Sequence, residues 1–106
     1  DYIFIKSEHQ LVKLNLNNIL YVEGFKDYLK IFTTTSTKPN LTLKSMKSME
    51  ETLHNKGFVR IHRSFMVSIP QISAVRGNRV KVGEKFLPIG DNYKSGFSEK
   101  VLMGHV

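Results

Sequence analysis

The apolar residues of this chain fall into short runs, and turn-forming residues separate one run from the next. Residues 2–6, 19–23 and 28–33 are such runs, each rich in β-branched or aromatic side chains and each followed by serine, glycine or threonine. A strand needs roughly four to eight residues and a helix about twelve, so runs of this length favour strands. With 106 residues, 41% of them hydrophobic, the chain can bury a core of its own. The sequence therefore predicts a single, mainly β domain.

Several turns between the predicted strands can be recognised directly. Gly-Asn at residues 77–78 suits a two-residue hairpin, and residues 24–27 break the strand that precedes them. Residues 34–40 are polar and include a proline, so we expect a mobile turn there. Because Pro88 has no N–H to donate, the last strand should lie at a sheet edge. The predicted strands cover residues 2–6, 11–14, 19–23, 28–33, 41–44, 58–61, 72–76, 79–82 and 85–89.

One helix is predicted over residues 45–54. Met46, Met49 and Leu53 recur there at helical spacing, which is typical of a small amphipathic helix packed on a sheet. Ser45 can cap its first turn, or a capping box made by the serine and glutamate at residues 48 and 51 can do so one turn later.

A second helical pattern covers residues 91–103. Tyr93, Phe97 and Val101 recur there at a spacing of four, and Asp91 is suited to the N-cap position. The fold class predicted from these patterns is a mainly β domain with one or two short helices.

The charge of the chain favours a polyanionic partner. Sixteen Lys and Arg face nine Asp and Glu, a net charge of +7. No acidic residue lies between Glu51 and Glu84, and that stretch contains all four arginines, Arg60, Arg63, Arg76 and Arg79. Phosphates can supply the missing counter-charge, and arginine donates two hydrogen bonds at once to phosphate or guanine. Charge alone leaves open a merely soluble basic domain, and it does not separate DNA from RNA or anionic lipid.

Catalytic and metal sites find little support in the sequence. Cysteine is absent, which excludes thiolate chemistry, and the histidines at residues 9, 54, 62 and 105 have no metal-ligand spacing. His62 and Ser64 stand too close along the chain, with no carboxylate near them, to form a catalytic triad. No apolar run could span a bilayer, and no signal peptide is visible. We expect no enzyme activity, cofactor, metal, small-molecule substrate or membrane partner.

The densest cluster of donor side chains lies in residues 58–67. If this strand alternates, Val59 and Ile61 face the core while Arg60 and His62 face outward, and a bend would expose Arg63. Three donor-rich side chains would then share one rim. A solvated strand face is an equally good interpretation of the spacing, and His62 could be a structural histidine.

This segment, Phe58-x-Arg60-Ile61-His62-Arg63-Ser64-Phe65, resembles the signature of LytTR-type domains, the DNA-binding output domains of LytR/AlgR-like response regulators. Further landmarks of the family follow in order over nearly the whole chain. They are Ile19-Leu20-Tyr21-Val22-Glu23 before the 24–27 loop and Tyr28, the helix ending at Leu53, and Leu87-Pro88-Ile89-Gly90 with Tyr93 and Phe97.

The resemblance implies an elongated antiparallel β-structure of three small sheets with one or two short helices, without a recognition helix. Loops of such domains enter successive major grooves of promoter direct repeats in double-stranded DNA, which bends, and pairs of protomers can act as a homodimer on DNA. It also implies a bacterial, cytoplasmic two-component regulator. Residues 1–106 would be one domain, excised from a chain with an N-terminal receiver domain.

Carried over by position, the resemblance gives three contact regions. The first is the loop from Gly24 to Tyr28, with Lys26 as its main contact, and the second is Arg60, His62 and Arg63, of which Arg63 contacts bases. The third follows Ile89, where many family members have an arginine and this chain has Asp91. Aspartate repels phosphate, so we expect Asp91 to cap a helix while Asn92 or Lys94 contacts DNA. The predicted contact residues are Lys26, Tyr28, Arg60, His62, Arg63, Asn92 and Lys94.

Two other functions are compatible with the sequence. An RNA- or single-strand-binding β-domain could stack bases on Phe25 and Tyr28, although both residues more easily anchor a loop. A basic protein-interaction module could use the same cations to bind an acidic partner.

Overall fold

The computed structural model describes residues 1–103, which form ten strands and two short α-helices. The strands are β1 (Tyr2–Ser7), β2 (Gln10–Asn15), β3 (Ile19–Phe25), β4 (Tyr28–Thr33), β5 (Ser36–Thr42), β6 (Phe58–His62), β7 (Phe65–Ser68), β8 (Ile72–Arg76), β9 (Arg79–Val82) and β10 (Lys85–Pro88). The helices are α1 (Met46–Thr52) and α2 (Lys94–Phe97). Single 3-10 turns cover Leu16–Asn18, Ile69–Gln71 and Asp91–Tyr93, and a π-helical turn covers Ser98–Leu102.

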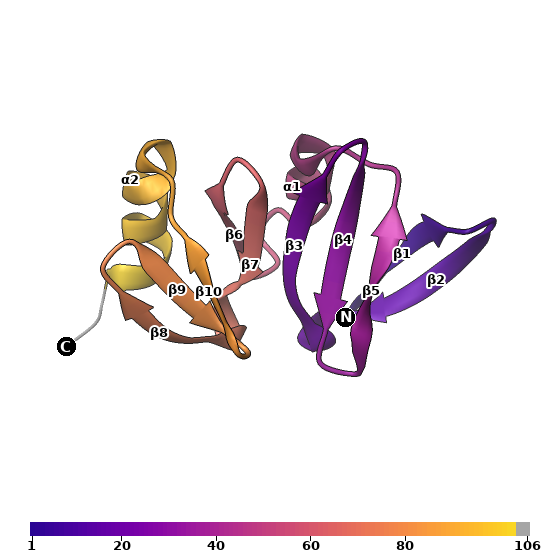
Figure 1. Cartoon of the computed structure of the whole chain (residues 1–106), viewed down its shortest axis with the longest axis horizontal. Coiled ribbons are helices and arrows are strands. Elements are labelled where there is room, and N and C mark those ends of the chain that lie inside the picture. Colours follow the sequence, from indigo (N-terminus) through magenta and orange to yellow (C-terminus); the bar gives the residue numbers. More distant parts are fainter. Residues whose placement is uncertain (104–106) are drawn as a thin grey trace.

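The strands form three antiparallel sheets arranged along an elongated molecule (Figure 1). The hairpin β1-β2 lies at one end, the five-stranded sheet β5-β4-β3-β7-β6 in the middle, and the three-stranded sheet β10-β9-β8 with α2 at the other end. The molecule measures 45 × 24 × 24 Å. The predicted three-sheet β-structure with two short helices is confirmed, and β10 is an edge strand as its proline indicated.

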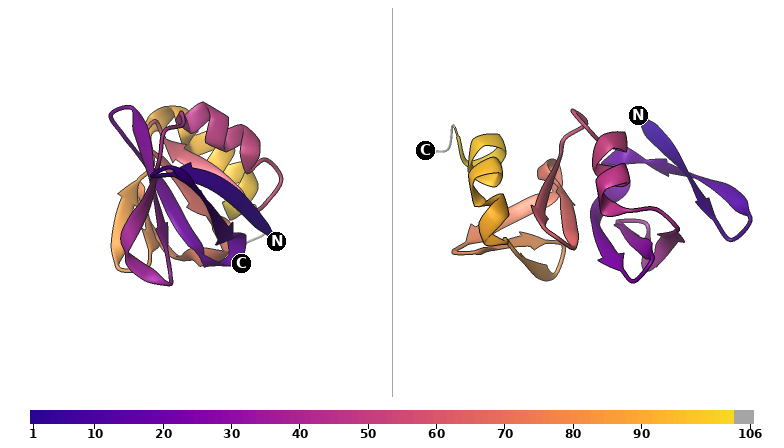
Figure 2. Two further views of the ribbon diagram at one scale, coloured as in Figure 1. Left: turned by 90° about the vertical axis from the view of Figure 1, so that its right-hand side faces the viewer. Right: turned by 90° about the horizontal axis from the view of Figure 1, so that it is seen from above.

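The five-stranded sheet separates two hydrophobic cores, because alternate side chains of its central strands point to opposite faces. Val22 and Met66 pack with α1 and the β1-β2 hairpin, whereas their chain neighbours Tyr21 and Val67 pack with α2 and the three-stranded sheet. All four side chains are buried. The two halves of the molecule (Figure 2) are therefore joined by strands that contribute to both cores.

The first predicted helix is confirmed, and the structure decides between its two caps. The Ser45 side chain accepts a hydrogen bond from the Ser48 backbone N–H at 3.0 Å, which satisfies one of the free donors of the first turn. Met46 and Met49 are buried against the sheet, as their spacing indicated.

The turn predicted over residues 34–40 is wrong in extent. Only Thr34 and Thr35 form a turn, and β5 begins at Ser36 and continues through Pro39. An edge strand can contain a proline because one of its two sides forms no ladder, and β5 lies at the edge of its sheet. The break predicted over residues 24–27 is also shorter, because β3 continues to Phe25.

The N-cap role predicted for Asp91 is wrong. Gly90 occupies the N-cap position of the 3-10 turn, and Asp91 is its first helical residue. Its carboxylate instead lies 2.9 Å from the Lys94 ammonium, one turn further along. The helical region from 91 to 102 is not one regular helix, since 3-10, α and π segments follow one another.

Within residues 1–103, no helix has the length and apolarity needed to cross a membrane.

Candidate nucleic-acid interface

Three connecting segments lie along the upper edge of the molecule in Figure 1, which we call the contact edge. They are the β3-β4 turn at Lys26 and Asp27, the β6-β7 turn at Arg63 and Ser64, and Asp91–Tyr93 before α2. The second view in Figure 2 looks down on this edge. These are the three regions that the sequence singled out, and the fold places them on one side of the molecule.

Two backbone hydrogen bonds fix the spacing of these segments. The Gly24 N–H donates to the Ser64 carbonyl at 2.9 Å, and the Gly90 N–H donates to the Ile61 carbonyl at 2.7 Å. The first segment is thereby held beside the second, and the third is held against strand β6. Backbone contacts thus contribute directly to the relative positions of all three segments.

The β3-β4 turn carries one exposed lysine at its tip. Lys26 has a φ of 57°, in the left-handed region that a tight turn between antiparallel strands requires. Phe25 and Tyr28 face each other across the base of this turn with their ring centroids 5.6 Å apart. Because each ring packs on the other, the pair anchors the turn, and Lys26 and Asp27 are the exposed side chains at its tip.

Arg60 braces the β6-β7 turn from within. Its guanidinium donates to the Arg63 carbonyl at 2.7 Å and to the His62 carbonyl at 3.3 Å, and it lies 3.3 Å from the Glu50 carboxylate. The same group is stacked 5.5 Å from the centre of the Tyr93 ring, and only 17% of the side chain is exposed. Most of its hydrogen-bonding capacity is thus used inside the protein, which suits a positioning residue better than a phosphate contact.

His62 also supports the turn, and it retains one donor. Its Nδ1 accepts a hydrogen bond from the Ser64 backbone N–H at 3.0 Å, and its ring packs 5.5 Å from Phe65. With Nδ1 as acceptor, the neutral imidazole carries its hydrogen on Nε2. The structural role that the sequence left open is therefore present, and Nε2 can still donate to a ligand.

Arg63 lies at the tip of the β6-β7 turn and faces a hollow shared with the first segment. The hollow has a volume of about 680 Å³. It is lined by Lys26, Asp27, Tyr28 and Arg63, together with Lys44, which lies two residues before α1. Lys44 was not singled out in the sequence, where it is one more lysine before a helix. Only the fold shows that three cations from three different segments surround one hollow.

The third segment carries a free amide and a paired lysine. Asn92 is exposed, whereas the Lys94 ammonium pairs with Asp91, whose side chain is 92% exposed. Exposed ion pairs of this kind contribute about 0–1 kcal/mol, so a phosphate can compete for Lys94.

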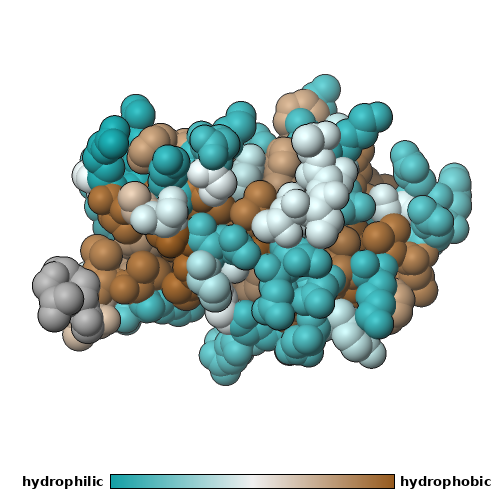
Figure 3. Space-filling view, turned by 90° about the horizontal axis from the view of Figure 1, so that it is seen from below, coloured by the Kyte–Doolittle hydropathy of each residue, from teal (hydrophilic) through white to brown (hydrophobic). Residues whose placement is uncertain are grey.

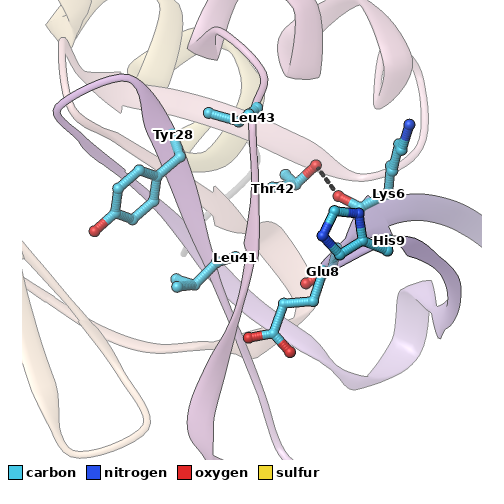
Figure 4. A pocket seen from close by; sticks show the side chains of 8 residues that line it. Lys6, Glu8, His9, Tyr28, Leu41, Thr42 and Leu43 are labelled. Carbon is cyan, nitrogen blue, oxygen red and sulfur yellow. Dashed lines mark hydrogen bonds between the residues drawn. The ribbon is translucent and has the colours of Figure 1, made fainter.

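A second hollow lies on the surface between the β1-β2 turn and strand β5. About 490 Å³ in volume, this hollow lies beside Tyr28 and is lined by Leu41, Leu43 and the β1-β2 turn residues Glu8 and His9 (Figure 4). Among residues 1–103, no three His, Asp or Glu side chains are grouped to hold a metal ion.

The face turned away from the contact edge is mixed in character. Figure 3 shows a hydrophilic band over the middle of this face, with hydrophobic surface on either side of it. The contact edge carries exposed cationic and amide side chains on the turns between strands. Neither α1 nor α2, with seven and four residues, has the length of a recognition helix. The fold and this edge together are those of a β-type nucleic-acid-binding domain, in which turns between strands carry the candidate contact residues.

Comparison with known proteins gives the family. The family model described as "LytTr DNA-binding domain" matches residues 9–101. The chain therefore belongs to the LytTR family of DNA-binding domains. Among solved structures, it is similar to the LytTr DNA-binding domain of a protein described as a methyl-accepting/DNA response regulator from Bacillus cereus. That similarity has a TM-score of 0.80 at 19% identity and covers 98% of this chain and 97% of the other. A search of curated proteins found no match.

Proposed function

We propose that this domain binds double-stranded DNA in a sequence-specific manner, as the cytoplasmic output domain of a bacterial two-component transcriptional regulator. The observation that carries the proposal is the alignment of three cationic or amide-bearing turns along one edge, each held by backbone hydrogen bonds. Turns fixed in this way can enter the grooves of one duplex together.

The residues on this edge would have three different roles: contacting phosphates, contacting bases and positioning the turns. Lys26 and Lys94 contact phosphates and supply salt-dependent affinity that does not depend on sequence. Arg63 contacts base edges, and a good bidentate pair with guanine contributes about 1–3 kcal/mol of discrimination. His62 through Nε2 and the Asn92 amide add further donors, while Tyr28 and Arg60 hold the turns in place.

Tandem binding follows from the size of the site. A single small domain offers few phosphate contacts, so two protomers on adjacent direct repeats, as a homodimer on DNA, would give the affinity that a promoter site needs. Bending of the duplex would add sequence dependence at base pairs that the protein does not touch.

Selection of bound duplexes from a random pool is the decisive experiment. Enrichment of a defined sequence, present as a direct repeat, is the expected result. A pool that stays random after several rounds while duplex binding persists would contradict sequence specificity.

Competition experiments at fixed salt test the two other candidate functions. We expect duplex DNA to displace a bound duplex far better than single-stranded DNA or RNA of the same length does. Tighter single-strand binding would favour a base-stacking β-domain. No binding to any duplex at low salt would favour an acidic protein partner.

A further inference from the structure

The outer face of the three-stranded sheet carries a second group of cations, away from the three contact segments. Arg76 and Arg79 lie directly opposite each other where β8 and β9 meet the Gly77-Asn78 turn. Lys81 follows on the same face of β9, opposite Phe86 of β10. Alternation along the strands puts all four side chains on one side of the sheet, while Val80 and Val82 face the core.

This arrangement lacks internal counter-charge. Like charges directly opposite each other on paired strands are destabilising. Within residues 1–103, no carboxylate lies within ion-pair distance of Arg76, Arg79 or Lys81. Phe86 offsets part of the cost, because the Arg76 guanidinium lies 4.9 Å and the Lys81 ammonium 5.9 Å from its ring centre. The ring restrains Arg76 but leaves the N–H groups at the rim of its guanidinium free for an anion.

The tip of this hairpin is connected to the contact edge. The Ile89 N–H donates to the Asn78 carbonyl at 2.7 Å, and Arg79 lies opposite Pro88. The chain then passes through Gly90 directly into the third contact segment. The hairpin tip that carries the arginine pair is therefore tied by a backbone hydrogen bond to the strand leading into the third contact segment, and the β8-β9 hairpin lies at the α2 end of the molecule in Figure 1.

We propose that Arg76 and Arg79 contact the phosphate backbone of the bound duplex beyond the third contact segment, where DNA that bends around the α2 end meets the β8-β9 hairpin. Arginine donates two hydrogen bonds to one phosphate, which suits a fixed pair at a hairpin tip. These contacts add affinity without sequence preference. The inference rests on the proposed function, since it concerns the same duplex.

The test compares the wild-type domain with the Arg76→Gln/Arg79→Gln double variant. Binding to a selected duplex and to a mixed-sequence duplex is measured by fluorescence anisotropy over a series of KCl concentrations. The slope of log Kobs against log[salt] is negative, and each lost phosphate contact reduces its magnitude by about 0.9. We therefore expect the magnitude of the slope to decrease by about 1.8 on both duplexes, while the ratio of the affinities for the selected and the mixed-sequence duplex stays unchanged.

Two further variants separate the position of these arginines from their charge. Lys6→Gln/Lys38→Gln removes the same charge from exposed positions on β1 and β5, outside the three-stranded sheet, and should leave the slope near the wild-type value. Arg76→Lys/Arg79→Lys keeps the charge and should restore most of the slope. Circular dichroism and thermal unfolding confirm that each variant is folded.

The possible outcomes separate this inference from the proposed function. A folded glutamine variant with an unchanged slope overturns the inference, leaves duplex binding intact, and points to an acidic protein as the partner of this face. An equal loss of slope in the Lys6/Lys38 variant, or no recovery with lysine at 76 and 79, also overturns it. If the wild-type domain binds no duplex, the proposed function itself fails.

Discussion

At the scale of single residues, position decides what an arginine does. Arg60 and Arg63 are three residues apart and chemically identical, yet Arg60 is largely buried with its guanidinium on two carbonyls and a carboxylate. Arg63 lies on the turn that Arg60 supports and borders the hollow shared with Lys26. One residue is therefore expected to set the shape of the site, and the other to contact DNA.

Arg63→Ala should reduce discrimination between a selected duplex and a scrambled one by about 1–3 kcal/mol, the contribution of one bidentate contact to a base. Competition anisotropy at fixed salt measures the ratio. Lys26→Ala provides the comparison, since it should weaken both duplexes equally and lower the salt slope by about one. An unchanged specificity ratio in Arg63→Ala would show that another residue contacts the bases.

Arg60→Ala should lower the free energy of unfolding by about 1.5–3 kcal/mol, because hydrogen bonds from a charged group are lost in a largely buried place. It should also weaken specific binding without changing the salt slope, since Arg60 is not expected to contact phosphate. Urea unfolding and salt-dependent anisotropy provide the two measurements. Glu50→Gln removes only the ion pair and should cost less than about 1 kcal/mol. A slope reduced by about one unit in Arg60→Ala would mean a direct phosphate contact.

At the scale of elements, the site consists of turns that neighbouring strands hold in register. The β6-β7 turn is the centre of this arrangement, because β7 pairs with β3 and β6 receives the hydrogen bond from Gly90. Close packing at Gly90 keeps the third segment near the other two. A Cβ there would lie 3.3 Å from Tyr93 Cδ2 and 3.5 Å from His62 Cδ2.

Gly90→Ala should therefore move the third segment away from β6. We expect a loss of about 1 kcal/mol of stability, the lower end of the range for overpacking, together with weaker specific binding. Gly96→Ala is the matched control, because no atom lies within 4 Å of its Cβ position and alanine favours the helix by about 0.5–1 kcal/mol. Thermal unfolding and anisotropy distinguish the two variants. Equal behaviour would mean that the 90–93 segment takes no part in binding.

At the scale of the whole molecule, elongation matters most for function. The molecule is 45 Å long, which at about 3.4 Å per base pair corresponds to about 13 base pairs, and the three contact segments lie within the part of that length between the β3-β4 turn and α2. Strands shared by the two cores keep this length rigid. The contact segments of one domain can thus follow no more than about one turn of a duplex.

Hydroxyl-radical footprinting should then show protection over no more than about 13 base pairs per domain, on one face of the helix. Two domains on direct repeats should lie on the same face when the repeats are a whole number of turns apart. Inserting about five base pairs, half a turn, between the repeats should abolish any mutual stabilisation while leaving single-site binding intact. A footprint as short as a single segment could protect would show that the three segments do not share one duplex.

The sequence by itself determined the local structure of this protein. Two-residue alternation and turn residues predicted most strands, and Ser45 with the methionine spacing predicted α1. These signals are local, because strand alternation, caps and tight turns depend on residues close together in the chain.

Only the tertiary structure decided which contacts each residue makes and which side chains remain available to a ligand. Pairing of β7 with β3 aligned the contact segments, the carbonyls of residues 62 and 63 and the distant Glu50 engaged Arg60, and Lys44 was brought beside Lys26. Asp91 proved to be a partner of Lys94 instead of a cap, and residues 36–40 became an edge strand. The physical reason is that hydrogen-bond partners and burial come from residues far away in the chain, which no local pattern of sequence contains.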